Sequence, residues 1–172
     1  MRFIFIIFLT IFKFEIATAN VKIAFIDLNF IMNNSLAGTS INTFIDNLSK
    51  EKNKSLKLLE NEIKKDENEL ISKKNIIEEN IYNKKVNEIR IRINDYKLEK
   101  QNFNRNLNER KIKYNNLLLE KLNPIISTYV EKNSITMVLP KKMIIIGKKD
   151  LDITKQILEA LNNSVQKINF DE

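Results

Sequence analysis

The chain lacks the two residue types that carry most metal-dependent and nucleophilic chemistry, since it contains no His and no Cys. Cys/His zinc sites, Ser-His-Asp triads and Cys-His nucleophiles are therefore excluded. Paired carboxylates, Gly-rich phosphate loops and metal-ligand spacings are missing as well. Asp27 could act as a general base, but a structural role at the end of a strand is the favoured interpretation. We therefore predict that the protein is not an enzyme and uses no cofactor or metal.

The charged residues that remain suit electrostatic binding. The formal net charge is +7, and most of the excess lies between Thr39 and Asn123. Basic surfaces attract nucleic acid, anionic lipid or acidic protein. Cations in the middle of this stretch are candidate binding residues: Lys73, Lys74, Lys84, Lys85, Arg90 and Arg92. A solvated helix face in a chain rich in Lys and Asn is an equally weighted interpretation.

The element that must position these cations is long. The 85 residues from Thr39 to Asn123 contain no Gly and no Pro, the two residues that most disfavour a helix interior. A single helix of this length would reach about 130 Å, and a hairpin of two helices about half of that. We predict a helical hairpin that begins near Thr39 or Ser40 and bends within Glu78–Lys85.

The apolar residues of this stretch follow a heptad-like pattern that is interrupted by charge. A seam with steps of three, four and seven residues includes Leu56, Leu59, Ile63, Leu70, Ile77 and Ile81 in the first half. In the second half the seam comprises Ile89, Ile93, Tyr96, Lys100, Phe103, Leu107, Arg110, Tyr114, Leu117 and Lys121. Because basic residues occupy several of these positions, we predict a weak coiled-coil-like contact and a mobile far end.

Short segments flank this hairpin on its N-terminal side. Val21–Asp27 has apolar residues on both faces and is predicted to be a buried strand. Leu28–Asn33 is predicted to form a helical turn, and Asn34–Gly38 a connection.

On the C-terminal side, Pro124 marks a change of direction, with Ile125–Glu131 as a kinked or restarted helix. The apolar runs Ile135–Leu139 and Met143–Ile146, on either side of Pro140, are predicted to form a β-hairpin. Asp152 is expected to cap a helix over Ile153–Leu161, and Asn162–Glu172 to be a frayed polar tail.

These elements predict an α+β fold: a small β-body formed by residues 20–38 and 124–172, and a helical arm formed by residues 39–123. A body of this size buries little surface, and its open strand edges favour pairing with further copies. We therefore expect the body to oligomerise. The candidate interface residues are Val21, Ile23, Phe25, Val138, Leu139, Ile144, Ile145 and Ile146.

The first residues have the pattern of a secretory signal peptide. A positive start at Met1-Arg2 precedes the mostly apolar run Phe3–Phe12, and Ala17-Thr18-Ala19 is an A-x-A cleavage site. We predict cleavage after Ala19, leaving residues 20–172 as a single domain in a bacterial periplasm; an uncleaved anchor is the alternative. Export disfavours nucleic acid as a partner.

Two segments resemble the Skp (OmpH-like) family of periplasmic chaperones. They are KIAFIDLNFIMNNSLAG at Lys22–Gly38 and ITMVLPKKMIIIGKKDLDITKQILEALN at Ile135–Asn162, of which the run Asp150–Thr154 is the most specific. The order of elements also agrees over nearly the whole chain, although the Asn-rich arm departs from the family.

The resemblance implies a jellyfish-like homotrimer with a central β-body and three arms around a cavity. Members of the family hold unfolded outer-membrane proteins there without ATP, and anionic lipid or lipopolysaccharide is a possible further ligand. The alternative is an exported coiled-coil spacer of the cell envelope. A spacer would need a continuous apolar seam, and this seam is interrupted.

Overall fold

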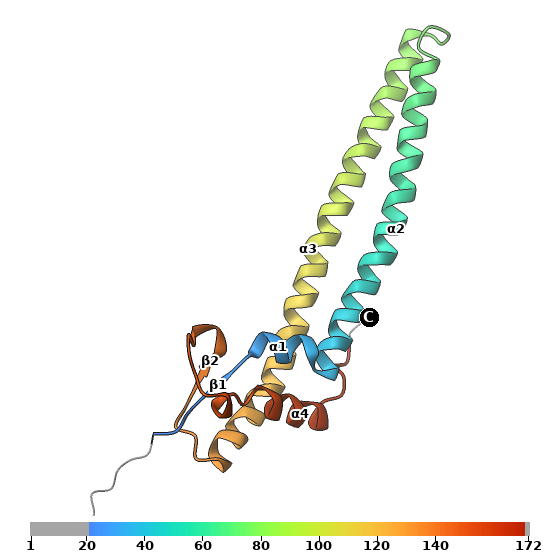
Figure 1. The fold of residues 1–172 in the computed structure, drawn as a ribbon. Helices are drawn as coiled ribbons and strands as arrows, with labels where there is room; N and C mark the ends of the chain where they lie inside the picture. Colours follow the sequence, from blue (N-terminus) through green and yellow to red (C-terminus); the bar gives the residue numbers. More distant parts are fainter. Residues whose placement is uncertain (1–20, 171–172) are drawn as a thin grey trace, which may run out of the picture.

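The computed structural model describes residues 21–170, and the predicted signal peptide with its cleavage site lies outside them. A long two-helix arm stands on a small body (Figure 1). The elements, in chain order, are β1 (Ile23–Ile26), α1 (Leu28–Asn34), α2 (Leu36–Ser72), α3 (Glu79–Lys132), β2 (Met137–Pro140), the 3₁₀ turns η1 (Lys141–Met143) and η2 (Lys149–Leu151), and α4 (Thr154–Ser164). The predicted α+β class with a long helical hairpin is confirmed.

Both ends of the arm differ from the predicted boundaries. Helix α2 begins at Leu36, not near Thr39 or Ser40, so the predicted connection over Asn34–Gly38 is wrong. The bend lies at Lys73–Glu78, just before the predicted Glu78–Lys85. No glycine is needed there, because the backbone closes with hydrogen bonds such as Ile76 N to Lys73 O at 2.9 Å.

A single residue, Ser35, separates α1 from α2 and ends one helix while starting the other. Its backbone N–H donates to Ile31 O at 2.9 Å, which closes α1. Its hydroxyl accepts from Gly38 N at 3.0 Å and caps α2. Ser35 is fully buried, so this capping occurs away from water. A serine cap of this kind satisfies a backbone donor that the helix itself cannot pair.

The contact between the two arm helices is thin, as predicted. On α2 only isolated seam residues are buried along the arm, namely Leu56, Ile63 and Leu70. The buried residues of α3 are Tyr114, Leu118 and Leu122, all at the root, next to the body. Between residues 79 and 113, the α3 side chains of the predicted seam are half-buried or exposed.

Helix α3 continues through Pro124 to Lys132 without a restart. Proline lacks the N–H that an interior helix position supplies, which normally costs a hydrogen bond. The carbonyl of Glu120 loses its helical donor, and since Glu120 and Pro124 are both exposed, water can pair that carbonyl. Thr128 Oγ1 donates to Pro124 O at 2.9 Å one turn later. The continuation of the helix over Ile125–Glu131 is confirmed.

The sheet of the body consists of two parallel strands, β1 and β2, with Ile23 opposite Met137 and Ile26 opposite Pro140. The predicted β-hairpin is wrong, because Ile144–Ile146 forms no strand in the described chain. Instead Met137–Pro140 pairs with β1, which precedes the arm in the sequence. The predicted strand Val21–Asp27 shortens to Ile23–Ile26.

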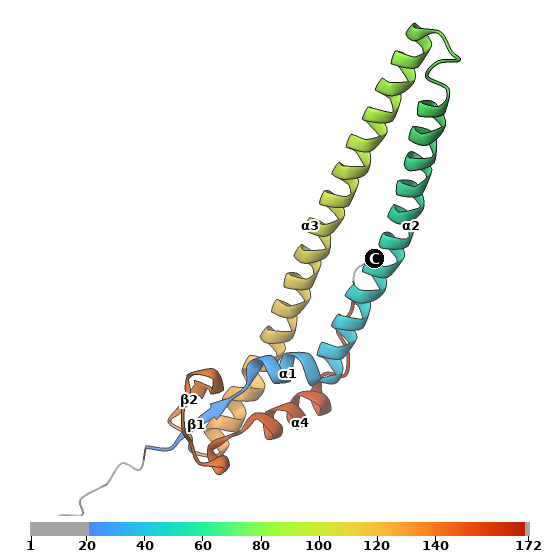
Figure 2. The ribbon, with the colours of Figure 1, turned by 45° about the horizontal axis from the view of Figure 1, so that its top comes forward.

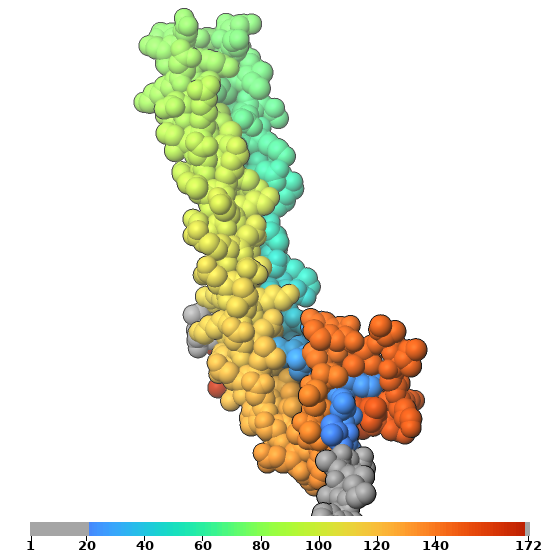
Figure 3. All heavy atoms as spheres, turned by 90° about the vertical axis from the view of Figure 1, so that its left-hand side faces the viewer, coloured from blue at the N-terminus to red at the C-terminus, as the bar shows by residue number. Residues whose placement is uncertain are grey.

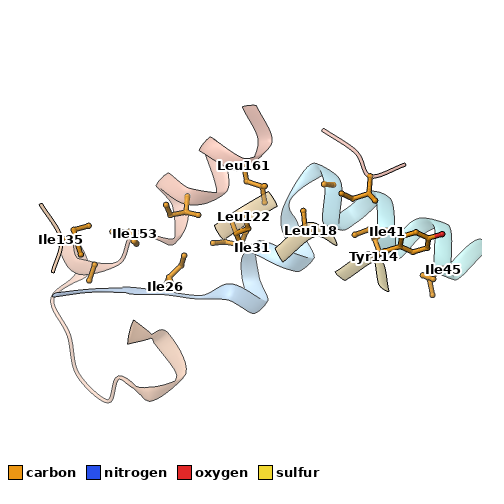
Figure 4. Close-up of a cluster of buried hydrophobic side chains, with 14 residues drawn as sticks. Ile26, Ile31, Ile41, Ile45, Tyr114, Leu118, Leu122, Ile135, Ile153 and Leu161 are labelled. Carbon is orange, nitrogen blue, oxygen red and sulfur yellow. The ribbon is translucent and has the colours of Figure 1, made fainter. Parts of the chain in front are cut away.

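The hydrophobic core lies where the body meets the root of the arm (Figure 4). Ile31 of α1, Ile41 of α2, Leu122 of α3 and Leu161 of α4 are fully buried there. Every major helix therefore contributes to one cluster, and the arm helices are fixed at their root while the rest of the arm projects from it.

The tail after α4 is not frayed over the residues described. Ile168 is buried with 4% exposure, and Phe170 packs against the same core. The rings of Phe170 and Phe44 stack with centroids 4.2 Å apart. Polar composition predicted a solvated tail, but two apolar side chains two residues apart are sufficient to dock it on the arm root.

Candidate functional site

The six predicted cations gather at the tip of the arm, far from the body (Figure 2). Lys73 and Lys74 lie in the turn, and both are exposed. Lys84, Lys85 and Arg90 are exposed on the first turns of α3. The turn therefore brings two separate parts of the sequence into one basic tip, as expected for a helical hairpin.

The cations of the tip do not form one surface. Lys73, Lys85 and Arg92 line a groove of about 520 Å³ together with three acidic residues, so its formal charges balance. These acids are Asp66, Glu69 and Glu88, and the apolar lining includes Leu70 and Ile77. Arg90 instead lines a smaller hollow of about 170 Å³, together with Ile71, Tyr82 and Val86. Lys74 and Lys84 line neither of these two spaces.

Arg92 differs from the other five cations because it links the two helices. Its Nη1 donates to Asp66 Oδ2 across the arm. Further down, Lys52 Nζ donates to Glu99 Oε1 at 2.5 Å and makes a second inter-helix link. Both pairs are partly exposed, so each contributes less than about 1 kcal/mol. They set the register of the helices where the apolar seam is thin.

Glu60, half-buried on α2 between the seam residues Leu56 and Ile63, is held between two lysines. Hydrogen bonds from Lys64 Nζ (2.6 Å) and Lys57 Nζ (3.2 Å) lower the pKa of the Glu60 carboxyl below its usual value. The same contact raises the pKa of Lys64. These groups stay charged at neutral pH, and the arm keeps its mixed but basic surface.

Sequence reasoning missed a second feature of the arm, a set of aliphatic side chains that face solvent between the charges. They are Leu58, Ile71, Ile76, Ile91, Leu98 and Ile112, each more than half exposed. In the sequence they can be recognised as apolar residues of the arm that do not belong to the heptad seam. Scattered singly, such residues form no continuous apolar patch, but they can make separate contacts with a flexible partner.

Of the predicted interface residues of the body, four are exposed and four are buried or half-buried. Ile145 and Ile146 are 97% and 92% exposed, and Val21 and Ile23 are also exposed. Phe25 is buried, and the remaining residues are half-buried: Val138, Leu139 and Ile144. In Figure 3 the blue N-terminal part of the described chain and the orange segment after α3 form one lobe at the base of the arm.

Asp27 has the structural role that was favoured. Its Oδ1 accepts from Phe30 N at 2.9 Å and caps α1, while its backbone N–H donates to Thr154 Oγ1 at 2.9 Å. Thr154 also donates to Asp152, which accepts from Lys141 Nζ at 2.7 Å. This chain of bonds ties the start of α1 to the start of α4.

Asp152 stays ionised within this chain of bonds. Burial opposes the charge, but hydrogen bonds from Lys141 and Thr154 outweigh it and lower the pKa of the Asp152 carboxyl. The predicted cap is wrong by one position: α4 starts at Thr154 with Ile153 as its N-cap, and Asp152 lies just before that cap, where its Oδ1 accepts from Thr154 N at 3.0 Å. The contact is structural and carries no catalytic geometry.

Within residues 21–170 no cluster of acidic, His or Cys side chains could hold a metal ion. None of the helices in this range is both long and apolar enough to cross a bilayer.

Comparison with known proteins agrees with this architecture. Residues 22–161 match the family described as outer membrane protein (OmpH-like). The fold matches a crystal structure, at 2.83 Å resolution, of a candidate outer membrane chaperone (OmpH-like) from Caulobacter crescentus CB15. The TM-score is 0.80 and the identity 16%, over 89% of this chain and 90% of that one. No curated protein matches the sequence. A basic two-helix arm on a small α+β body, matched over nearly all of the described residues, places this chain in the OmpH-like family, a chaperone family.

Proposed function

We propose that this chain is a periplasmic holdase that binds unfolded outer-membrane proteins between its arms, without ATP, and prevents their aggregation. The observation that carries the proposal is the surface of the arm, where single exposed aliphatic side chains lie among charged residues, of which lysines and arginines outnumber the acids. Each such contact is weak, so a client held by many of them can be released without fuel.

The basic tip suits the capture of unfolded barrel proteins, which are often acidic. Long-range attraction speeds association and weakens with added salt. Anionic lipid or lipopolysaccharide would be drawn to the same cations, and we propose it as a secondary ligand. The interrupted seam disfavours the alternative of a rigid envelope spacer, because a spacer must resist bending.

The proposal includes a homotrimer assembled through the body. Ile145 and Ile146 are almost fully exposed beside a two-stranded sheet with open edges. Strand edges and bare aliphatic side chains of this kind favour pairing with identical copies. Ile145→Ser with Ile146→Ser should lower the mass measured by sedimentation equilibrium, whereas Leu58→Ser on the arm should not. A mass that is monomeric for the unmodified protein would refute the trimer.

An aggregation titration tests the holdase. A urea-unfolded outer-membrane barrel protein is diluted into buffer with increasing amounts of residues 20–172, without ATP, and light scattering is followed. We expect suppression that saturates near about three chains per client, as a trimer requires. No suppression at any ratio, from protein shown to be folded by circular dichroism, would refute the proposal and favour the spacer.

A matched pair of variants tests the tip. Replacing Lys73, Lys74, Lys84 and Lys85 by Gln should weaken client binding and flatten its dependence on salt. The control carries the same number of Lys→Gln changes on the body, at Lys142, Lys148, Lys149 and Lys155, which are also exposed. Equal loss of binding in both variants would show that net charge matters and that the tip is not a site.

A further inference from the structure

The segment after α4 lies across the root of the arm. Helix α4 closes with Val165 N donating to Leu161 O at 2.7 Å, and the chain then rises beside the lower part of α2 (Figures 1 and 2). We call Val165–Phe170 the strap. Phe170 stacks on Phe44 of α2, and its ring meets Tyr114 of α3 edge-on with centroids 5.1 Å apart. The strap therefore contacts both helices of the arm.

The surface under the strap is an aromatic and aliphatic groove. We call it the root groove and define it by Phe44, Tyr114, Leu117 and Lys121. Phe44 and Tyr114 also meet edge-on, at 5.7 Å, and form a preassembled aromatic corner. A hollow of about 490 Å³ lies between the strap and α3, lined by Leu117 and Lys121 of α3 and by residues 164–169 at the end of α4 and in the strap. Space therefore remains between the strap and the root groove.

The strap has the pattern of an extended segment with apolar residues on one side. The alternation covers the last four residues of the strap: Ile168 is buried and Phe170 half-buried, while Lys167 before them and Asn169 between them are exposed. Side chains two residues apart point to the same side of an extended chain. Strands of membrane β-barrels alternate apolar and polar residues with the same period. An unfolded barrel segment can therefore present the same pair of side chains as the strap does.

We propose that the root groove is a binding site for extended client segments that carry an aliphatic and an aromatic residue two positions apart, and that the strap occupies it in the absence of client. The inference rests on the proposed holdase function and adds a specific site to it, distinct from the basic tip. Because the strap and the client occupy the same groove, the docked strap lowers the apparent affinity of the chain for the client.

The competition has a simple measurable form. Docking the strap orders six residues of irregular backbone, an entropic cost that opposes the burial of its apolar side chains. A ligand of the open groove then binds with an apparent affinity reduced by the fraction of open chains. If the strap is docked nine-tenths of the time, freeing the groove should tighten ligand binding about tenfold.

The experiment uses the chain 20–172 with Ile168→Ser and Phe170→Ser, which weakens the strap but keeps its length. The matched control changes two exposed strap residues, Gln166→Ser and Asn169→Ser. The probe is a fluorescein-labelled peptide rich in Thr and Gln that carries one Ile-x-Phe step, and a second peptide has Ile and Phe adjacent. Fluorescence anisotropy measures binding, and circular dichroism confirms folding.

We expect the strap variant to bind the Ile-x-Phe peptide about tenfold more tightly than the control variant and the unmodified chain. Adding Phe44→Ala to the strap variant should remove this gain, and the adjacent Ile-Phe peptide should bind more weakly. Equal affinity in all variants, or a gain that survives Phe44→Ala, would overturn the inference. If the strap variant does not fold, single Phe170→Ser in the same assay replaces it.

The aggregation titration separates this inference from the proposed function. Normal suppression by every variant without a change in peptide affinity would refute the root groove and leave the holdase intact. A gain in peptide affinity with no suppression of aggregation by any variant would refute the holdase and leave an apolar peptide site.

Discussion

Replacing Gly38 by Ala tests how tightly α1 packs on the start of α2. Gly38 is buried in the first turns of α2, directly under the last turn of α1. A Cβ at this position would collide with the backbone O of Met32, and would lie 2.8 Å from its carbonyl C and 2.9 Å from Ser35 Oγ.

The magnitude follows from these distances. Carbon atoms in contact lie about 3.5–4.0 Å apart, so the backbone of α1 would have to move by about 1 Å. Overpacking of this kind costs about 1–3 kcal/mol, and more where backbone must move. Alanine regains about 1 kcal/mol of helix propensity over glycine. Because backbone must move here, the upper part of the overpacking range applies, and after the regained helix propensity is subtracted we expect Gly38→Ala to lower the free energy of unfolding by about 1–2 kcal/mol, against the usual direction for this change in a helix.

Urea denaturation followed by circular dichroism measures this loss, with all variants at one protomer concentration because association shifts apparent stability. Asn47→Ala, at an exposed position of the same helix, is the control and should be neutral or slightly stabilising. If Gly38→Ala were as stable as the unmodified protein, the close approach of α1 to α2 would be wrong.

Three further changes probe other contacts. Ser35→Ala removes the buried cap of α2 and strands the N–H of Gly38, so we expect a loss of about 1–2 kcal/mol in the same denaturation assay; no loss would mean that another group caps the helix. Because the folded-state pKa of Asp152 is lowered, its contribution to stability is present above the unfolded value of about 3.9 and is lost as pH falls through the folded value. Thermal melts should therefore show that Asp152→Asn flattens the decline of stability as the pH falls below about 4 to 5, and an unchanged acid limb would refute the link. Arg92→Ala should change global stability by less than about 1 kcal/mol, yet speed amide exchange near Ile89 more than Lys84→Ala does, since of these two residues it is Arg92 that bridges the helices; equal exchange in the two variants would contradict this.

The arm could be predicted because its signal is local. A stretch without Gly or Pro and with apolar residues every three to four positions specifies helix at each turn, independently of distant parts. Its ends could not be placed, because Gly38 is accepted inside α2 for a tertiary reason, the approach of Met32, which the local sequence does not encode.

The body was harder to predict because its partners are distant in sequence. Met143–Ile146 has the composition of a strand, but nothing local shows whether an edge is available to it in a single chain. The partner of Met137–Pro140 is β1, which precedes the arm. The tail was misjudged for a similar reason, since two apolar residues among polar ones become informative only when Phe44 and Tyr114 are seen beside them.

At the candidate site, the sequence located the basic tip but not the distribution of its cations. Which lysines share a groove depends on the rotation of α2 against α3, and a weak seam leaves that rotation to inter-helix pairs such as Arg92 with Asp66. The exposed aliphatic residues could not be predicted from the heptad pattern, because they lie outside the seam that this pattern defines.

The parallel pairing of β1 with β2 has a consequence for the order of folding. Lys22 and Asn133, which meet through a hydrogen bond at 2.9 Å, are 111 residues apart in the chain. Closing so large a loop in a flexible chain is entropically expensive and slow. A preformed helical hairpin shortens the effective loop, because it holds its own two ends close together. The arm therefore acts as an internal splint for the rest of the molecule: we expect its helices to form before the sheet, so that folding kinetics depend on an element most of whose length lies outside the core.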